Sequence, residues 1–564
     1  MNSSNLMFTP IVLPLLGSAL ILMVKSFSSR KGRIIAEYMG SAIGLLLPLA
    51  SLFVLYPVVR EQGFLQQVVG SWDPSIGIMY RFDGLSFLMI LLSQLISIPA
   101  WIYSRGRGPK ENTFTALFLI QNASIAAISM CSDLFNLFVC LEVMGMTAYV
   151  LIASSKKNAA AFASFSYLLF SSTAMVFFLV GTYGLYRITG SLSYAGITTM
   201  IPEPNLMSSV CLVLITVSVL LRVAIMPLSF WLVPAHSKAP HAVSAMLSSV
   251  LLKIPLFSLV RILSLVSIGS DIGLVVSYAG AFTALFAVLL ALSQKDAKQL
   301  LAYHSISQIG YITAAWGMAL HAGVTSKTGA FLLSVAFFHA LYHAMFKALL
   351  FLSVGTTTDY ANQRNVYILR GANAQLRASG EKVPITMLCY FVGALSITAI
   401  PPFNGFFSKT LLTYALKETM QYTLLTLAGV GTLASFIKLS RIYLPAKPTG
   451  QEETKPFPKS IHIALSVLAL FCIAGGVFAP QVFNFIKELL ASHPEQEQLS
   501  FKFFTSSNLL KVLYTSLGGI VLFILAVSKT GTKLLSLLKN LPRSFSDAFF
   551  GFAVSIAILV YVLL

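Results

Sequence analysis

Titratable residues inside long apolar segments carry the clearest chemical meaning in this sequence. Glu142 lies within the apolar run Leu134–Ala153, and three further runs contain Arg222, Lys253 and Lys409. A charged side chain at membrane depth is costly to insert, so such residues usually mark an ion or substrate pathway. Each has a simpler interpretation, a static ion pair for Glu142 and side chains that reach back to the membrane surface for the lysines. Taken together, they favour a protein that moves charge across a membrane.

A second group of titratable residues lies on one apolar helix. In the stretch FFHALYHAMFKALLFL, His339, His343 and Lys347 follow one another at intervals of four and share one broad helix face. Histidine titrates near neutrality, and a desolvated lysine can do so too, so this stack favours a proton relay over satisfied core residues. A metal site is the alternative. We expect none, because this helix has no Asp, Glu or Cys at ligand spacing.

Three further residues are candidates for proton uptake or relay near the ends of spans. Lys298 and His304 lie in the segment QKDAKQLLAYHSISQIGY, and His236 belongs with Lys238 and His241 to a basic group beside a proline-rich segment. A solvated, charged loop explains either group equally well. The sequence therefore leaves both interpretations open.

The composition is that of a polytopic membrane protein. Hydrophobic residues make up 57% of the 564 residues and charged residues only 10%, and the mean hydropathy is +0.82. Lys and Arg number 38 against 19 Asp and Glu, an excess that we assign to membrane topology and not to nucleic-acid binding. The five cysteines lie in apolar stretches without CxxC spacing, and there is no glycine-rich phosphate motif. We therefore expect reduced thiols and no cofactor on this chain.

Apolar runs of about 20 residues predict sixteen membrane spans joined by short polar loops. The first run has no basic residue before it and no cleavage signal after it, so we expect a retained span and not a signal peptide. The predicted spans are Leu6–Val24, Ile34–Val59, Leu85–Tyr103, Phe114–Met130, Leu134–Ala153, Ala159–Tyr186, Leu206–Trp231, Ala242–Leu263, Ile272–Leu292, Leu300–Leu320, Ala330–Val354, Pro384–Ala415, Tyr422–Tyr443, Ile461–Phe485, Leu509–Val527 and Ala548–Leu564.

The charges of the loops predict the orientation of the chain. Loops after the odd-numbered spans are rich in Lys and Arg, whereas the alternate loops are mixed or acidic. Examples from the basic loops are Arg105, Lys156, Lys295, Arg364 and Lys438. The positive-inside rule places these loops in the cytoplasm and both termini on the outer side. We expect an integral protein of a prokaryotic cytoplasmic membrane.

Two spans are interrupted by proline. The seventh contains Pro227 near its end, and the twelfth is overlong and contains Pro401, Pro402 and Gly405. Proline removes a backbone hydrogen bond, and in lipid the freed groups must face protein or water. Broken helices in corresponding halves of a transporter often form its ion or substrate site, although a simple packing kink is the alternative. A buried cation near each break, Arg222 or Lys409, favours the functional interpretation.

At these motifs the chain resembles the antiporter-like subunits shared by respiratory complex I, membrane-bound energy-converting hydrogenases and multi-subunit sodium/proton (Mrp-type) antiporters. The matching stretches run in the same order from Asp133 to Lys409. They are FNLFVCLEVM, MPLSFWLVPAHSKAPHAVSAMLSSVLLK, DAKQLLAYHSISQIGY, HALYHAMFKALLFL and IPPFNGFFSK. The resemblance implies an all-α fold with a fourteen-helix core of two inverted five-helix repeats, each with a broken helix, plus two C-terminal helices. The expected divisions are 1–104, 105–293 (first half-channel), 294–450 (second half-channel) and 451–564.

The resemblance also implies roles for single residues. Glu142 is then the carboxylate of the first half-channel, Lys253 the connecting lysine, His339 and His343 the central relay, and Lys409 the exit-side lysine. Arg222 departs from the family pattern, which has lysine five residues before the first break's proline. Because a guanidinium cannot release its proton in a protein, Arg222 is expected to act as a fixed counter-ion for Glu142 and to modify or disable the first half-channel.

The expected function is proton or sodium translocation by one membrane subunit, with the energy supplied by its partners. Such a chain belongs to the translocase part of an oxidoreductase complex of the quinone reductase or hydrogenase type, beside other membrane subunits that include antiporter-like paralogues. Three alternatives stay open: a cation/proton antiporter without redox chemistry, an autonomous transporter of a small solute, and the membrane partner of a zinc protein in inorganic-carbon uptake. The predicted cytoplasmic stretch Ser528–Asp547 spans at most about 30 Å as a helix, too short to brace several subunits.

Overall fold

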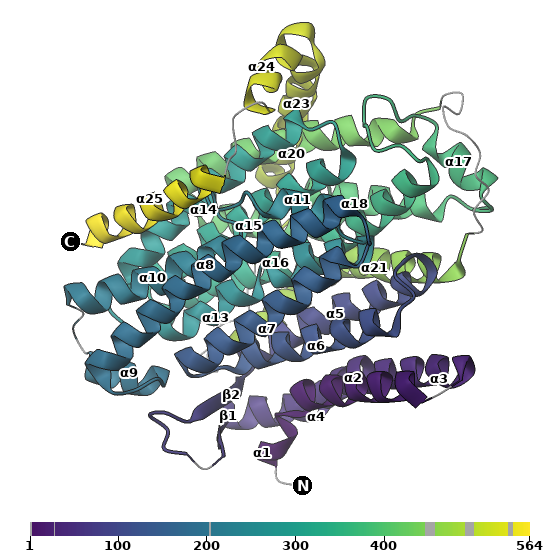
Figure 1. Cartoon of the computed structure of the whole chain (residues 1–564). Coiled ribbons are helices and arrows are strands. Elements are labelled where there is room, and N and C mark those ends of the chain that lie inside the picture. Colours follow the sequence, from purple (N-terminus) through teal and green to yellow (C-terminus); the bar gives the residue numbers. More distant parts are fainter. Residues whose placement is uncertain are drawn as a thin grey trace.

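The computed structural model describes residues 3–27, 29–70, 72–201, 203, 205–445, 457–490, 501–539 and 545–563. Helices run side by side through almost all of this part of the chain (Figure 1). Eleven of them are long and apolar enough to cross a membrane, and four shorter apolar helices accompany them. The prediction of an all-α polytopic membrane fold is confirmed. The count of sixteen spans stays a prediction, and the expected boundary between residues 450 and 451 lies outside the described residues.

The N-terminal helices lie along one edge of the bundle and lead into a β-hairpin (Figure 1). Strands β1 (Phe64–Val69) and β2 (Ile78–Asp83) pair antiparallel, with Phe64 opposite Asp83. This hairpin is a local departure from the predicted all-helical chain and lies in the loop between the second and third predicted spans. The helices of this part are α1 (Ser3–Leu6), α2 (Thr9–Phe27), α3 (Arg30–Ser41), a π-helical turn (Ala42–Leu46), α4 (Leu47–Gln62), α5 (Gly84–Arg107) and α6 (Asn112–Met130).

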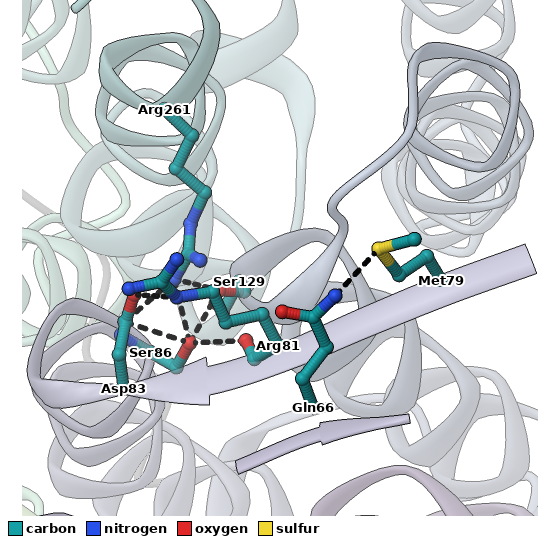
Figure 2. A network of polar contacts seen from close by, with 7 residues as sticks. All are labelled: Gln66, Met79, Arg81, Asp83, Ser86, Ser129 and Arg261. Carbon is teal, nitrogen blue, oxygen red and sulfur yellow. Dashed lines mark hydrogen bonds and ion pairs between the residues drawn. The ribbon is translucent and has the colours of Figure 1, made fainter. Parts of the chain in front are cut away.

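A polar network ties the hairpin to the helix ends beside it (Figure 2). Arg261 donates to Asp83 Oδ1 and Ser86 Oγ, each at 2.7 Å, and to the Ser129 carbonyl at 3.1 Å. Asp83 also caps α5 by accepting from the amide of Ser86, and Arg81 contacts its other oxygen at 3.4 Å. Arg261 lies in the last turn of the helix Ile254–Leu263, Ser86 in the first turn of α5 and Ser129 in the last turn of α6. This one guanidinium therefore joins three helix ends.

Two sets of helices follow, and their loops pair in the same way. Asp133 caps the first helix of one set and bridges to Ser193, while Asp296 caps the corresponding helix of the other set and bridges to Asn365. The first set comprises α7 (Leu134–Ala153), α8 (Asn158–Thr189), α9 (Tyr194–Met200), α10 (Leu206–Arg222), α11 (Leu232–Lys238), α12 (His241–Met246), a π-helical turn (Leu247–Leu251), α13 (Ile254–Leu263) and α14 (Gly269–Ser293). The second comprises α15 (Ala297–His321), α16 (Lys327–Tyr360), α17 (Ala372–Ala378), α18 (Ile385–Ile397), α19 (Asn404–Ala415), α20 (Met420–Ser440) and the 3₁₀ turn Arg441–Tyr443.

The C-terminal helices cover the second set and then cross back towards the first (Figure 1). The fourteenth predicted span, Ile461–Phe485, was expected to be one helix, and this prediction is wrong. The chain turns at Phe478, and a second helix begins there with Pro480 in its first turn. Helix α24 has only 11 residues, a length of about 16 Å. The helices are α21 (Lys459–Val477), α22 (Ala479–Leu490), α23 (Ser506–Val527), α24 (Lys529–Lys539) and α25 (Phe545–Leu563).

Candidate functional site

The two broken helices have the same backbone geometry. After α10 the amides of Ala224 and Ile225 bond to carbonyls three and five residues earlier, and after α18 the amides of Ala399 and Ile400 do the same. Ala224 and Ala399 both have positive φ angles, +60° and +59°, and each lies three residues before a proline that follows a cis peptide bond. Two segments with this match form equivalent breaks, as expected for a repeated fold.

Arg222 lies at the first break and is almost fully buried. Its Nη1 donates to the Leu141 carbonyl at 2.8 Å, and its Nη2 forms an ion pair with Glu142 Oε1. Glu142 itself is 27% exposed, more than its place in an apolar run suggested. The exposed side chains of Val139 and Met146 lie on the same helix. Glu142 therefore sits where the buried interior meets an apolar outer face of the chain.

Gly145 provides the space for this guanidinium. A Cβ atom at Gly145 would lie 2.7 Å from the hydroxyl of Tyr149 and 3.0 Å from Nη1 of Arg222. A side chain at this position would press on the guanidinium, so the glycine leaves room for it where α7 and α10 approach each other. No pattern in the sequence pointed to Gly145, because its contact with Arg222 joins segments far apart in the chain.

Lys253 lies at a break of a different kind in the middle of the eighth predicted span. The π-helical turn Leu247–Leu251 ends just before it, and its Nζ donates to the Ser248 carbonyl at 2.7 Å. Side chains of the same turn reach the second set of helices: Ser248 Oγ lies 2.7 Å from Ser305 Oγ, and Ser249 donates to the Ala344 carbonyl. Lys253 is fully buried where the two sets meet.

Helix α16 carries His339, His343 and Lys347 through the centre of the chain, and all three are fully buried. The rings of His339 and His343 are stacked with centroids 6.3 Å apart, and His339 Nδ1 lies 3.0 Å from Ser408 Oγ. Lys347 Nζ donates to the Leu301 carbonyl at 2.5 Å. Within the described part of the chain, neither ring nitrogen of His343 has a hydrogen-bond partner. Lys253, Lys347 and Lys409 are all within its electrostatic range.

Lys409 lies in α19, the helix after the second break. Its Nζ donates to the Ile397 carbonyl at 2.7 Å and lies 4.9 Å from the centre of the Tyr311 ring. Ile397 is the last residue of α18, so the ammonium group faces the negative end of a helix dipole. Pro401 and Pro402 form the link between the two half-helices.

The weaker candidates are buried too, and a solvated loop does not describe them. Lys298 is fully buried, and its Nζ donates to the Ala239 carbonyl at 2.7 Å. His236 stacks on Phe351 with centroids 4.8 Å apart, and His304 lies beside Phe436. Lys298 and Lys347 are both within electrostatic range of His236. Lys298 and His304 thus extend the series of buried titratable residues to the first two turns of α15. His236 extends it to α11, the helix that follows the break at Pro227.

An ion-pair cluster that sequence reasoning missed lies next to Lys298. His241 Nε2 lies 3.0 Å from Asp359 Oδ2, and Arg107 Nε lies 3.5 Å from the same oxygen. Tyr103 and Thr356 share a hydrogen bond of 2.8 Å beside it. These residues come from the ends of α5 and α16 and the start of α12, which only the folded chain brings together.

Lys438 corrects one of the loop assignments. It was counted among the basic loops although the predicted span Tyr422–Tyr443 contains it, and the structure buries it inside α20. Its Nζ donates to the carbonyls of Leu292 at 2.5 Å and Gln294 at 2.8 Å, at the end of α14. The lysine thus caps another helix and is within electrostatic range of His304.

Comparisons with known proteins identify a family model, relatives and a solved structure that are similar to this chain. Residues 131–437 match the family model described as NADH:quinone oxidoreductase/Mrp antiporter, transmembrane. The chain is 30% identical to NADH-quinone oxidoreductase subunit N of Desulforudis audaxviator over 74% of its length and 85% of that protein. It is 27% identical to a Na(+)/H(+) antiporter subunit of Alkalihalophilus pseudofirmus over 85% of its length and 95% of that protein. It also resembles a chain of the membrane-bound sulfane sulfur reductase, an archaeal respiratory membrane complex, with a TM-score of 0.73 and 25% identity over 91% of this chain and 99% of that one.

Proposed function

The chain belongs to the NADH:quinone oxidoreductase/Mrp antiporter transmembrane family, and from this premise we propose that it translocates protons as one membrane subunit of a larger ion-pumping complex. One observation carries the proposal. His343 lies within electrostatic range of both Lys253 and Lys409, and all three are fully or nearly fully buried near the two broken helices. Burying titratable groups in a membrane protein is costly if they serve only as structure. A series of such groups that bind and release protons is well suited to relay them.

We assign the order of the relay from these contacts. Lys298, with His236 and His304 nearby, takes up protons, and Lys347 and His343 pass them along α16. His339 hands them to the region of Ser408 and Lys409 at the second break. In this scheme residues 105–293 form the first half-channel and residues 294–450 the second, with 1–104 and 451–564 outside them.

The first half-channel has a modified role in this proposal. Arg222 holds Glu142 in an ion pair and also bonds to the Leu141 carbonyl, so its guanidinium is fixed in place. Since arginine keeps its proton, Glu142 cannot exchange a proton with it. The pair then acts as a charge sensor at the edge of the chain, and the transported proton uses the second half.

The partners of this proposal are other membrane subunits. The exposed apolar side chains next to Glu142 on α7 offer a contact for an antiporter-like neighbour. Relatives include a subunit of an NADH-quinone oxidoreductase and a subunit of a Na(+)/H(+) antiporter, which support a redox-driven complex and, as the second candidate, an antiporter without redox chemistry. We propose a prokaryotic cytoplasmic membrane as the location, with both termini outside.

Purification of the intact complex, followed by mass spectrometry of all its subunits, distinguishes these candidates. Redox subunits identify a respiratory or hydrogenase type, and their absence beside antiporter subunits identifies the second candidate. The reconstituted complex is then assayed for proton and sodium movement. Lys347→Met should abolish proton movement, whereas Lys327→Met, an exposed lysine at the start of the same helix, should leave it intact. Equal transport by both variants would exclude a relay along α16.

A further inference from the structure

Helix α23 lies outside the region that matches the family model, yet it packs closely on the second half. A Cβ atom at Gly519 would lie 2.6 Å from the side chain of Leu433 in α20, so the glycine lets the two helices approach closely. The segment before α23 packs Phe503 on Phe407 with centroids 5.1 Å apart and Phe504 on Phe406 at 5.4 Å. The helix is therefore part of the wall of the second half and not a loose extension.

A pocket of about 60 Å³ lies between α19, α20 and α23 and reaches Lys409. Thr410 and Thr413 line it from α19, and Thr515 and Ser516 line it from α23. A single water molecule needs about 10–15 Å³ of such space and two or more polar partners. The pocket can therefore hold a short chain of water molecules beside the ammonium group.

Lys511 is the second cation of this pocket. It is half-buried in the second turn of α23, with its Nζ 4.3 Å from the centre of the Tyr422 ring. Tyr422 lies in the first turn of α20, so Lys511 marks the end of the pocket nearer the membrane surface, while Lys409 marks the end at the break. Two cations thus stand at the two ends of one small pocket with polar and apolar lining residues.

The lining of the pocket also bears on which ion can use it. Among the described residues that line it, none is Asp or Glu, whereas two are lysines. A sodium ion would meet two ammonium groups without an anionic ligand, which is unfavourable at short range. A proton avoids this problem because it travels on the lysines and the water itself.

We propose that α23 completes the release pocket of the second half and that Lys511 relays protons from Lys409 to the outer surface. Protonated Lys409 gives its proton to the water chain, the neutral amine of Lys511 accepts a proton from that chain, and Lys511 then loses it to the outer solution. Each transfer leaves the donor neutral and the acceptor charged, so no other reactant is needed. This inference rests on the proposed function of the second half.

The test uses the intact complex in liposomes that contain a pH-sensitive dye, with proton movement driven by a potassium diffusion potential. Lys511→Gln should lower the proton flux about tenfold at unchanged subunit content. Lys511→Arg should be equally slow, because arginine keeps the charge and cannot release the proton. Lys502→Gln, an exposed lysine in the segment before the same helix, is the matched control and should transport normally. Lys409→Gln should abolish the flux.

A second measurement tests access and does not depend on transport. Cysteine at position 515, introduced as Thr515→Cys, should react with a membrane-impermeant maleimide added from the outer side, whereas Ser435→Cys, fully buried in α20, should not. Normal flux in Lys511→Gln with no flux in Lys409→Gln would overturn the role of Lys511 and keep the proposed function. Normal flux in both would overturn both. Normal flux in Lys511→Arg, or no labelling at position 515, would also refute the release pocket.

Discussion

The ammonium group of Lys409 donates a 2.7 Å hydrogen bond to the carbonyl of Ile397, across the break that separates α19 from α18. The lysine of one half-helix thereby satisfies the last carbonyl of the other. In the proposed relay, the proton of this ammonium group is the one to be released. One hydrogen bond would then serve both the link between the two half-helices and the release of the proton.

Substitution of Lys409 can separate these two roles. Lys409→Arg keeps a donor and a positive charge near the Ile397 carbonyl, so the complex should stay assembled, while proton flux falls by about 10²-fold or more because arginine keeps its proton. Lys409→Met removes the hydrogen bond too and should lower the thermal stability of the complex. Flux and melting temperature, measured on the same preparations, check both. Normal flux in the arginine variant would contradict a release step at Lys409.

Glu142→Gln tests the carboxylate at the edge of the first half. Glutamine fits the same space and can still accept a hydrogen bond from Arg222, but it carries no charge. We expect an assembled complex with strongly reduced ion translocation in reconstituted vesicles, because the charge that pairs with Arg222 has been removed. Unchanged translocation would mean that the ion pair is only structural.

Arg222→Lys introduces the lysine that the family pattern has at this position and tests whether it supports transport. Lysine supplies the charge and can also release its proton, so transport should be kept or raised. Arg222→Ala should be worse, because it leaves Glu142 without its partner at a cost of about 3 kcal/mol, the low end of the range for a broken buried pair since Glu142 is 27% exposed. If Lys fails as completely as Ala, the second hydrogen bond to the Leu141 carbonyl is essential.

His343→Ala should slow proton movement far more than His321→Ala. His343 is fully buried among three lysines, whereas His321 is exposed at the end of α15, where its side chain contacts Ser270. Loss of a positioned proton carrier typically costs about 10²-fold in rate. Flux measured side by side in vesicles compares them, and equal rates would remove His343 from the relay.

Asp359→Asn probes the cluster beside Lys298. The neutral amide should weaken the pairs with both His241 and Arg107 and slow proton uptake from the cytoplasmic side, with little effect on assembly. Asp271→Asn, an exposed carboxylate at the start of α14, is the matched control. The rates of both variants over a range of proton concentrations check the role. A parallel response in the two would show that Asp359 does not take part in uptake.

Much of the local structure was predictable from this sequence alone. Span Leu134–Ala153 was placed residue for residue, and the breaks at Pro227 and Pro402 were identified from proline alone, because apolar length and a missing amide donor are properties of the local chain. The membrane fold followed from composition and apolar runs, and the family from the order of the motifs. The roles of the candidate site residues stay predictions.

Only the tertiary structure decided which of these residues meet. Asp359 pairs with His241, Lys438 caps α14, and Lys511 shares a pocket with Lys409, although each pair or contact joins segments far apart in the sequence. Glu142 reached the edge of the chain although its neighbours in sequence are as apolar as those of Lys253. Hydrophobicity and helical period specify which segments enter the membrane, but the contacts between helices depend on side-chain packing across the whole bundle, and no single segment contains that information.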